Sequence, residues 1–200
     1  MPSIYDVKPA FQSLLRPIVN FLATTKVTPN HVTLLACFCS FVVAIVIGLN
    51  YQDRFIFWLF PVFLFIRMAL NAIDGMLAKE HGMKTPMGAL LNELTDMLAD
   101  AALYLPFAFL SPYFYLPVGV IIVLSVITEA CGLAAVSIGA SRRYDGPMGK
   151  SDRAFVFSLV AIALALGTPI GLWLECVWLI MIALLVMTVA NRAKQALGEV

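Results

Sequence analysis

The chain has 200 residues, of which 62% are hydrophobic and only 12% charged, with a formal net charge of +1. A soluble domain has roughly 25% charged residues, so this composition excludes an ordinary soluble protein and indicates a polytopic membrane protein. The chain has no basic patch interleaved with aromatic residues, so nucleic acid is not a predicted partner. The four cysteines match no zinc-site spacing and no secreted disulfide framework.

Residues 1–28 are predicted to form an amphipathic helix that is distinct from the rest of the chain. Apolar residues recur at helical spacing from Ile4 to Phe21, with Lys8 and Arg16 among the other positions. Such a helix is expected to lie in the membrane interface. The alternative is a helix that packs on a soluble partner.

Six apolar segments follow, each a candidate to cross a bilayer, which takes about 20 residues. Pro, Gly or charged residues separate them. The predicted spans are 32–49, 55–77, 87–110, 115–138, 154–166 extended by the residues just before it, and 170–190. The predicted fold is therefore all-α and integral to the membrane, with residues 29–200 forming one six-helix transmembrane domain.

Lysine and arginine residues are distributed unequally between the two sides of these spans. If the N-terminus lies inside, eleven of the thirteen fall in inner segments, Arg54 alone lies in an outer loop, and Arg67 lies within a span. Cytoplasmic segments carry the excess of positive charge in membrane proteins. We therefore expect both termini in the cytoplasm, in a bacterial inner membrane.

Polar residues form a stripe on the second and third predicted spans. Residues three, four and seven apart share one face of a helix. The stripe consists of Arg67, Asn71, Asp74 and Ala78 on the second span and Gly88, Asn92, Asp96 and Asp100 on the third. Carboxylates at membrane depth are costly and usually functional, and hard oxygen ligands suit Mg²⁺, Mn²⁺ or Ca²⁺. The alternative is a set of hydrogen bonds that holds the helices together.

This stretch resembles the signature of the CDP-alcohol phosphotransferase family, integral membrane enzymes of phospholipid synthesis. The signature reads Asp, two residues, Asp-Gly, two residues, Ala-Arg, and after a gap Gly, three residues, Asp, three residues, Asp. Its spacing is kept throughout, with Asn71 and Asn92 in place of Asp and Lys79 in place of Arg. The matching positions are Asn71, Asp74, Gly75, Ala78, Lys79, Gly88, Asn92 and Asp96.

The resemblance implies a metal-dependent transfer from a CDP-linked donor with release of CMP, in a homodimer. The implied metal ligands for Mg²⁺ or Mn²⁺ are Asn71, Asp74, Asn92 and Asp96, and Asp96 is the implied catalytic base. Gly75, Ala78, Lys79 and Gly88 are the implied contacts of the CDP moiety. Because only two of the four acidic positions are kept, Asp100 or Glu93 could join the metal ligands, and one metal ion could replace two.

A cationic group lies before and at the start of the fifth predicted span, on the same inner side as the motif. It consists of Arg142, Arg143, Lys150 and Arg153. This group could bind the phosphate of an acceptor, or it could be a positive inner loop that contacts lipid headgroups. Glu129, in the fourth span, could pair with Arg67 or line the acceptor pocket. Asn30 and Thr33 could cap the first span or contact the donor.

The predicted function is the transfer of a phosphatidyl group from CDP-diacylglycerol to a small polyol or polyol phosphate at the cytoplasmic face. One alternative reverses the donor, so that a soluble CDP-alcohol gives its phosphoalcohol to a lipid. Another is a degenerate member that binds a nucleotide-lipid without turnover. A transporter is disfavoured because the outer halves of the third and fifth spans are apolar.

Overall fold

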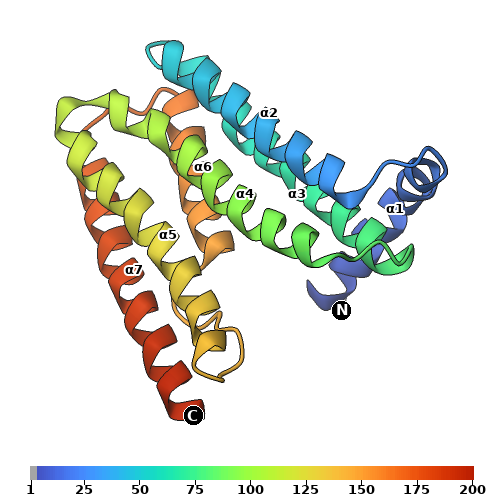
Figure 1. The fold of residues 1–200 in the computed structure, drawn as a ribbon. Helices are drawn as coiled ribbons and strands as arrows, with labels where there is room; N and C mark the ends of the chain where they lie inside the picture. The colour runs from blue at the N-terminus through green and yellow to red at the C-terminus, as the bar shows by residue number, and fades with distance from the viewer. Residues whose placement is uncertain (1–3) are drawn as a thin grey trace. The chain divides into compact units, whose positions relative to one another are not determined.

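The computed structural model describes the backbone of residues 4–200 and the side chains from residue 9 onward. Every regular element in that part of the chain is helical, which confirms the all-α prediction (Figure 1). The α-helices are α1 (Ile4–Thr24), α2 (Pro29–Leu49), α3 (Leu59–Glu80), α4 (Pro86–Tyr104), α5 (Tyr115–Ser137), α6 (Lys150–Ala165) and α7 (Leu172–Glu199). Three short 3₁₀ helices are η1 (Arg54–Trp58), η2 (Leu105–Leu110) and η3 (Pro112–Phe114).

The helices divide between two compact units. The first unit comprises Met1–Phe41 and Val62–Ala99, and the second comprises Val42–Pro61 and Asp100–Val200. Helices α2, α3 and α4 each begin in one unit and end in the other. The signature positions from residue 71 to residue 96 therefore all lie in the first unit, whereas Asp100 lies in the second.

A Thr-Pro pair begins both α2 and α4. The Thr28 hydroxyl accepts a hydrogen bond from the His31 amide at 3.4 Å, and the Thr85 hydroxyl accepts one from the Gly88 amide at 2.9 Å. The side chain of a capping threonine satisfies an amide that has no partner in the first turn, and proline suits the next position because it has no amide hydrogen. Thr28, rather than Asn30 or Thr33, is thus the residue that caps the first span.

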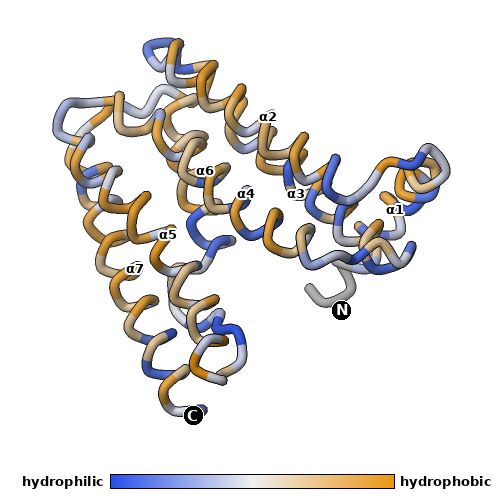
Figure 2. Tube along the Cα trace, in the orientation of Figure 1, coloured by the Kyte–Doolittle hydropathy of each residue, from blue (hydrophilic) through white to orange (hydrophobic). Residues whose placement is uncertain are grey.

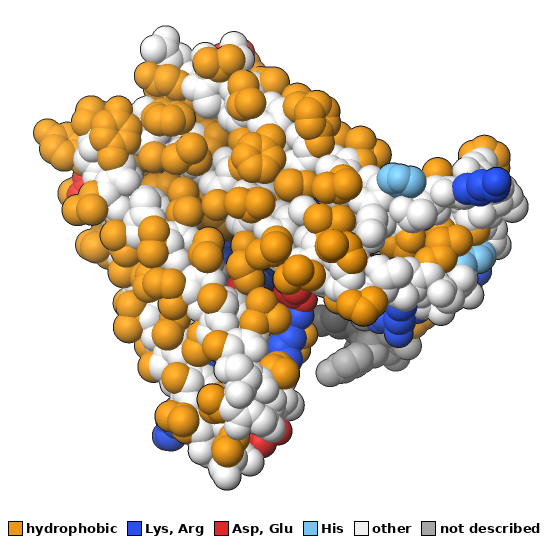
Figure 3. Space-filling view, viewed as in Figure 1, with side chains coloured by type: hydrophobic (Ala, Val, Ile, Leu, Met, Phe, Trp, Pro, Cys, Tyr) orange, Lys and Arg blue, Asp and Glu red, His pale blue; other side chains and the backbone are white. Residues whose placement is uncertain are grey.

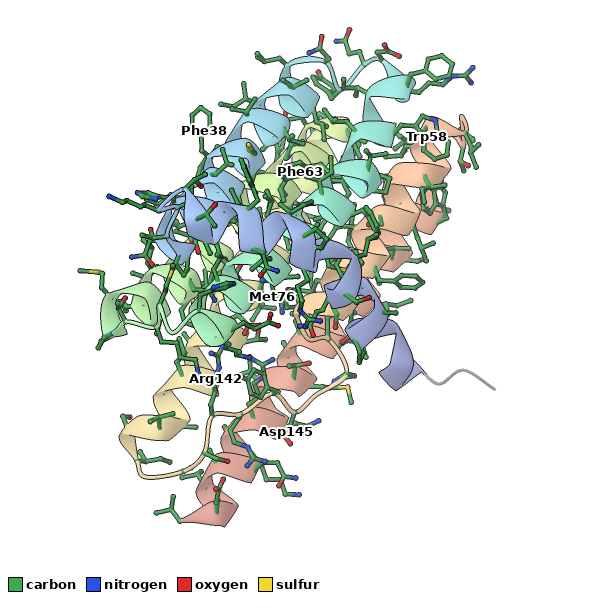
Figure 4. All side chains as sticks on the ribbon, turned by 90° about the vertical axis from the view of Figure 1, so that its right-hand side faces the viewer. Phe38, Trp58, Phe63, Met76, Arg142 and Asp145 are labelled. Atoms are coloured by element: carbon green, nitrogen blue, oxygen red, sulfur yellow. The ribbon has the colours of Figure 1, made fainter. Side chains whose placement is uncertain are left out.

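The core of the first unit forms where α1 packs against α3. Leu15 and Val19 of α1 are buried with Ile73, Met76 and Leu77 of α3, and Figure 4 shows Met76 against α1. Other large apolar side chains of α1 are exposed: Leu14, Ile18 and Phe21. The predicted helix is therefore present, and it packs some of its apolar side chains against α3 while others remain exposed.

Aromatic side chains form the core of the second unit. The Phe107 ring lies 5.1 Å from that of Phe60 and 5.0 Å from that of Phe157, measured between centroids. Phe157 stacks on Tyr104 at 4.1 Å. In the same unit α5 and α7 lie side by side (Figure 1). These contacts join η2, α4, α6 and the start of α3 in a single packed cluster.

Four helical segments are long and apolar enough to cross a membrane, which indicates an integral membrane protein. They are Pro29–Leu49, Arg54–Glu80, Pro112–Ser137 and Leu172–Glu199. Figure 2 shows their hydrophobic composition, and in Figure 3 hydrophobic side chains cover most of the face of α2 that is in view. Phe38 on α2, for example, is 67% exposed.

The other two predicted spans do not meet this criterion, for different reasons. Helix α4 has 19 residues but carries Glu93, Asp96 and Asp100 along its length. Helix α6 has 16 residues, which makes it about 24 Å long, whereas the hydrocarbon core of a bilayer is about 30 Å thick. The polar stripe itself thus removes the apolar character of the third predicted span.

Candidate active site

The polar stripes of α3 and α4 meet within the first unit. Arg67 of α3 donates from Nη2 to Asp96 Oδ1 of α4 at 2.9 Å and to the Asp96 carbonyl at 3.3 Å. Asn71, one turn further along α3, donates from Nδ2 to the same Asp96 Oδ1 at 3.4 Å. Asn92 is half-buried one turn before Asp96. The expectation that these two helices point their polar residues at each other is confirmed for Asn71 and Asp96.

Asp74 is held by a residue of a third helix. Its side chain is buried, and Asp74 Oδ2 accepts a hydrogen bond from the Thr33 hydroxyl of α2 at 2.8 Å. The same hydroxyl also bonds the Pro29 carbonyl at 3.0 Å. Because a hydrogen bond to a carboxylate restrains its orientation, Thr33 orients Asp74.

The two signature glycines have different surroundings. A Cβ added at Gly88 would lie 2.8 Å from Asn30 Oδ1 and 3.0 Å from Thr85 Oγ1, so packing alone explains why this residue is small. A Cβ added at Gly75 would meet no atom of the described residues within 4 Å. The open space at Gly75, next to buried Asp74, is therefore available to a ligand. Ala78 is half-buried and Lys79 exposed in the last turn of α3.

The oxygen donors of this site suit a hard divalent cation. They are the carboxylates of Asp74 and Asp96 and the amide oxygens of Asn71 and Asn92, which are ligands that Mg²⁺ and Mn²⁺ accept. Among the described residues no group of three or more His, Cys, Asp and Glu side chains is placed to hold a metal ion. A metal held here would use the amide oxygens of Asn71 and Asn92 together with the two carboxylates, and this donor set fits a hard divalent ion.

A second group of buried charges lies in the other unit. Arg153 of α6 bonds the Glu129 carboxylate at 3.1 Å and lies 3.6 Å from Asp100 Oδ2. Arg192 of α7 reaches the other Glu129 oxygen at 3.5 Å and bonds the Thr128 carbonyl. Both arginines are almost fully buried. The suggested pairing of Glu129 with Arg67 is wrong, because Glu129 binds these arginines and Arg67 binds Asp96.

The other members of the predicted cationic group surround the loop before α6. Arg142 lies over the Tyr144 ring at 4.9 Å, and Arg143 forms ion pairs of 2.8 Å with both Asp145 and Glu199. Figure 4 shows Arg142 and Asp145 in this loop. The hydrogen bond from Arg143 lowers the pKa of Asp145 below its ordinary value. Lys150 is the first residue of α6 and is half-buried.

Comparison with known proteins identifies the family. A sequence model described as CDP-alcohol phosphatidyltransferase matches residues 26–190. The chain belongs to this family. The inner membrane protein YnbA of Escherichia coli is 44% identical over 195 residues, which cover 98% of this chain and 96% of YnbA. A phosphatidylinositol phosphate synthase of Corynebacterium glutamicum is 30% identical over 52% of this chain and 45% of its own length.

Solved structures agree with the family fold. The phosphatidylinositol phosphate synthase PgsA1 of Mycobacterium tuberculosis, with CDP-DAG bound, matches with a TM-score of 0.76 at 20% identity. The match covers 90% of this chain and 92% of that one. The same enzyme in complex with manganese and citrate also gives 0.76, at 18% identity and 90% and 88% coverage. The fold of this chain is thus that of a CDP-alcohol phosphatidyltransferase, with asparagine at two acidic signature positions.

Two functional features of this family member were not expected from its sequence. The sequence predicts a cap or a donor contact for Thr33, but not its hydrogen bond with Asp74. Arg192 was counted only as an inner positive charge, yet it is buried against Glu129. Arg192 lies next to Asn191, Lys194 and Gln195 in the polar last part of α7, so its sequence context gives no signal that its side chain is buried.

Proposed function

We propose that this protein transfers the phosphatidyl group of CDP-diacylglycerol to a hydroxyl of a small polyol and releases CMP. Family membership supports a CDP-linked donor, and the M. tuberculosis structure with CDP-DAG bound supports a lipid on that donor. The observation that carries the proposal is the open space at Gly75 beside buried Asp74, on a helix that meets Asp96 through Asn71. Gly75, Ala78, Lys79 and Gly88 are the proposed contacts of the CDP moiety.

The proposed reaction assigns separate roles to the two carboxylates. Asp96 accepts the proton of the acceptor hydroxyl as its oxygen attacks the β-phosphorus, and the bond to the CMP oxygen breaks. Asp74, Asp96, Asn71 and Asn92 would hold Mg²⁺ or Mn²⁺, with Asp100 as a further candidate ligand. When bound, the metal neutralises the diphosphate and stabilises CMP as a leaving group. Thr33 keeps Asp74 oriented throughout.

The proposed acceptor site is the cationic group of the second unit. The Arg153 guanidinium uses its terminal nitrogens for Glu129, Thr128 and the Met148 carbonyl. Its Nε is buried without a hydrogen-bond partner among the described residues. A buried donor without a partner is costly. An oxygen of the acceptor substrate could accept a hydrogen bond from this Nε, which supports a role for Arg153 in acceptor binding. Arg142, Arg143 and Lys150 are the other proposed contacts, and they favour a phosphorylated polyol.

The proposed arrangement in the membrane follows the six-span prediction. Helices α4 and α6 would be the fifth and sixth spans, in addition to the four candidates. Helix α4 fails the criterion because it carries acidic residues of the site, and α6 because it is short. The YnbA relative is an inner membrane protein, which supports a bacterial inner membrane. Both termini and the active site would face the cytoplasm. Helix α1 would lie in the membrane interface, and residues 29–200 would form the transmembrane domain of a homodimer.

The test of this function is CMP release by the purified full-length protein in liposomes. CDP-diacylglycerol and Mg²⁺ or Mn²⁺ are supplied with glycerol phosphate, inositol phosphate, free polyols or serine in turn. We expect metal-dependent CMP release that requires one acceptor, and a loss of about 100-fold or more in Asp96→Ala because a general base is removed. Arg16→Gln, which breaks an exposed ion pair with Glu80, is the control.

Two other outcomes would replace this proposal. CMP release only with a CDP-alcohol and a lipid acceptor would establish the reversed donor. Binding of CDP-diacylglycerol without CMP release under any condition would identify a member that binds the nucleotide-lipid without turnover.

A further inference from the structure

We infer that Glu199, the last residue of α7, is a positioning residue for acceptor binding, because it holds the loop before α6 against the end of its own helix. The loop, residues 138–149, joins α5 to α6 and carries Arg142 and Arg143, two of the proposed acceptor contacts. The inference rests on the proposed function and extends it to a carboxylate that lies outside both the signature and the cationic group.

Glu199 accepts three hydrogen bonds from the loop, which lies beside the end of α7 (Figure 1). Its Oε1 accepts from the Ser141 amide at 3.1 Å, and its Oε2 accepts from the Ser141 hydroxyl and from Arg143 Nη1, each at 2.8 Å. Arg143 also donates from Nε and Nη2 to the Asp145 carboxylate, at 2.8 Å and 3.1 Å. Contacts of this kind are directional. An acceptor that binds Arg143 therefore meets a guanidinium whose orientation is already set.

Helix α7 also holds the other end of the loop. The Met148 amide donates to the Thr188 hydroxyl at 3.0 Å, and both residues are buried. Gly146 has a φ of 125° and passes so close to α7 that an added Cβ would lie 2.6 Å from Thr188 Cγ2. The Met148 carbonyl in turn accepts a hydrogen bond from Arg153 Nη1 at 3.3 Å. The loop is therefore fixed on both sides of Arg143, and its second fixed point contacts Arg153 directly.

The contact at Glu199 can be broken without unfolding the loop. The Glu199 side chain is 40% exposed, and the Arg143 amide has its own hydrogen bond to the Gly132 carbonyl at 3.2 Å. Removing the Glu199 charge therefore frees the Arg143 guanidinium while the main chain around it stays held. A change at Thr188 would instead leave the buried Met148 amide without its partner, which is costly for stability. Position 199 thus separates the positioning of Arg143 from the stability of the fold.

The test measures the KM for the acceptor that supports CMP release, with purified full-length protein in liposomes. In Glu199→Gln we expect this KM to rise about fivefold, the upper range for an exposed ion pair, with kcat and the KM for CDP-diacylglycerol unchanged. A second readout needs no activity. Limited digestion with trypsin in detergent, followed by mass spectrometry, should show cleavage after Arg143 accelerated by about the same factor, because the protease cuts the locally opened loop.

Glu80→Gln is the matched control, since it breaks an exposed ion pair with Arg16 of 3.0 Å in the first unit by the same substitution. It should change neither the acceptor KM nor cleavage after Arg143. An unchanged acceptor KM in Glu199→Gln would overturn the inference, and so would a parallel loss of kcat and of both KM values, which indicates general damage. Faster cleavage in this variant without CMP release by the wild type would reject the proposed function and keep Glu199 as the residue that holds the loop.

Discussion

Buried arginines meet carboxylates in both units of this protein, but the contacts that hold these carboxylates differ between the units. In the second unit, Arg153 and Arg192 face Glu129 and Asp100, two cations against two anions. In the first unit, Arg67 faces Asp96, while Asp74 adds a further negative charge and bonds Thr33. In the first unit, one carboxylate is therefore held by an arginine and the other by a hydroxyl.

The buried charged residues of the two units also differ in what surrounds them. The arginines of the second unit also bond main-chain carbonyls of Met148, Thr128 and Asp145, so they tie α5, α6, α7 and the loop before α6 together. The site of the first unit lies beside the open space at Gly75. Arginines that bond the main chain of several elements indicate a network that stabilises the fold around the proposed acceptor site, whereas a carboxylate oriented by a hydroxyl beside open space indicates the proposed metal and nucleotide site.

Removing Arg153 should have the largest effect, on stability. Arg153→Leu leaves Glu129 and Asp100 buried with one cation fewer, and breaking a buried ion pair from one side costs about 3–5 kcal/mol. Thermal unfolding in detergent measures this loss. Arg16→Gln, which breaks an exposed ion pair with Glu80, is the control and should unfold near the wild-type temperature. An Arg153→Leu protein of normal stability that loses only acceptor binding would show that the network is not structural.

Filling the space at Gly75 should have the opposite pattern, with activity lost and stability kept. Gly75→Ala meets no described atom and should raise helix stability by up to about 1 kcal/mol. If the nucleotide approaches here, CMP release should fall by about 100-fold, since small displacements of a reacting group have effects of that size. Gly119→Ala in α5 has equally open surroundings and should gain stability without losing activity. Equal activity in both variants would place the nucleotide elsewhere.

Helical periodicity explains which contacts of these charged residues could be predicted from the sequence. The spacing of Asn71, Asp74, Asn92 and Asp96 assigned one face to each of two helices, and the contact between Asn71 and Asp96 followed from it. The signature then identified the family. Periodicity specifies the face of a residue but not which distant helix it contacts, so Glu129 could not be matched with Arg153 instead of Arg67.

The number of spans shows a second limit. Hydropathy suggested six spans, but four segments meet the criterion of length and composition. A segment that carries the proposed active-site carboxylates, such as α4, is less apolar because of them.

The start of α2 shows the same limit at the level of single residues. Asn30 and Thr33 were the predicted candidate caps, but Thr28 caps α2 and Thr33 contacts Asp74.

The smallest expected effect comes from the one hydroxyl that orients the site of the first unit. Thr33→Val keeps the shape of the side chain but removes the hydrogen bond to Asp74 Oδ2, and the loss of such a supporting contact weakens metal binding by about 10- to 100-fold. Mn²⁺ titration measures this, and stability should change by only about 1 kcal/mol. Ser40→Ala is the control, because the Ser40 hydroxyl is also buried in α2 but bonds the Ala36 carbonyl of its own helix. If both variants bind Mn²⁺ like the wild type, Asp74 does not depend on Thr33 for metal binding, and the hydrogen bond between them only joins α2 to α3.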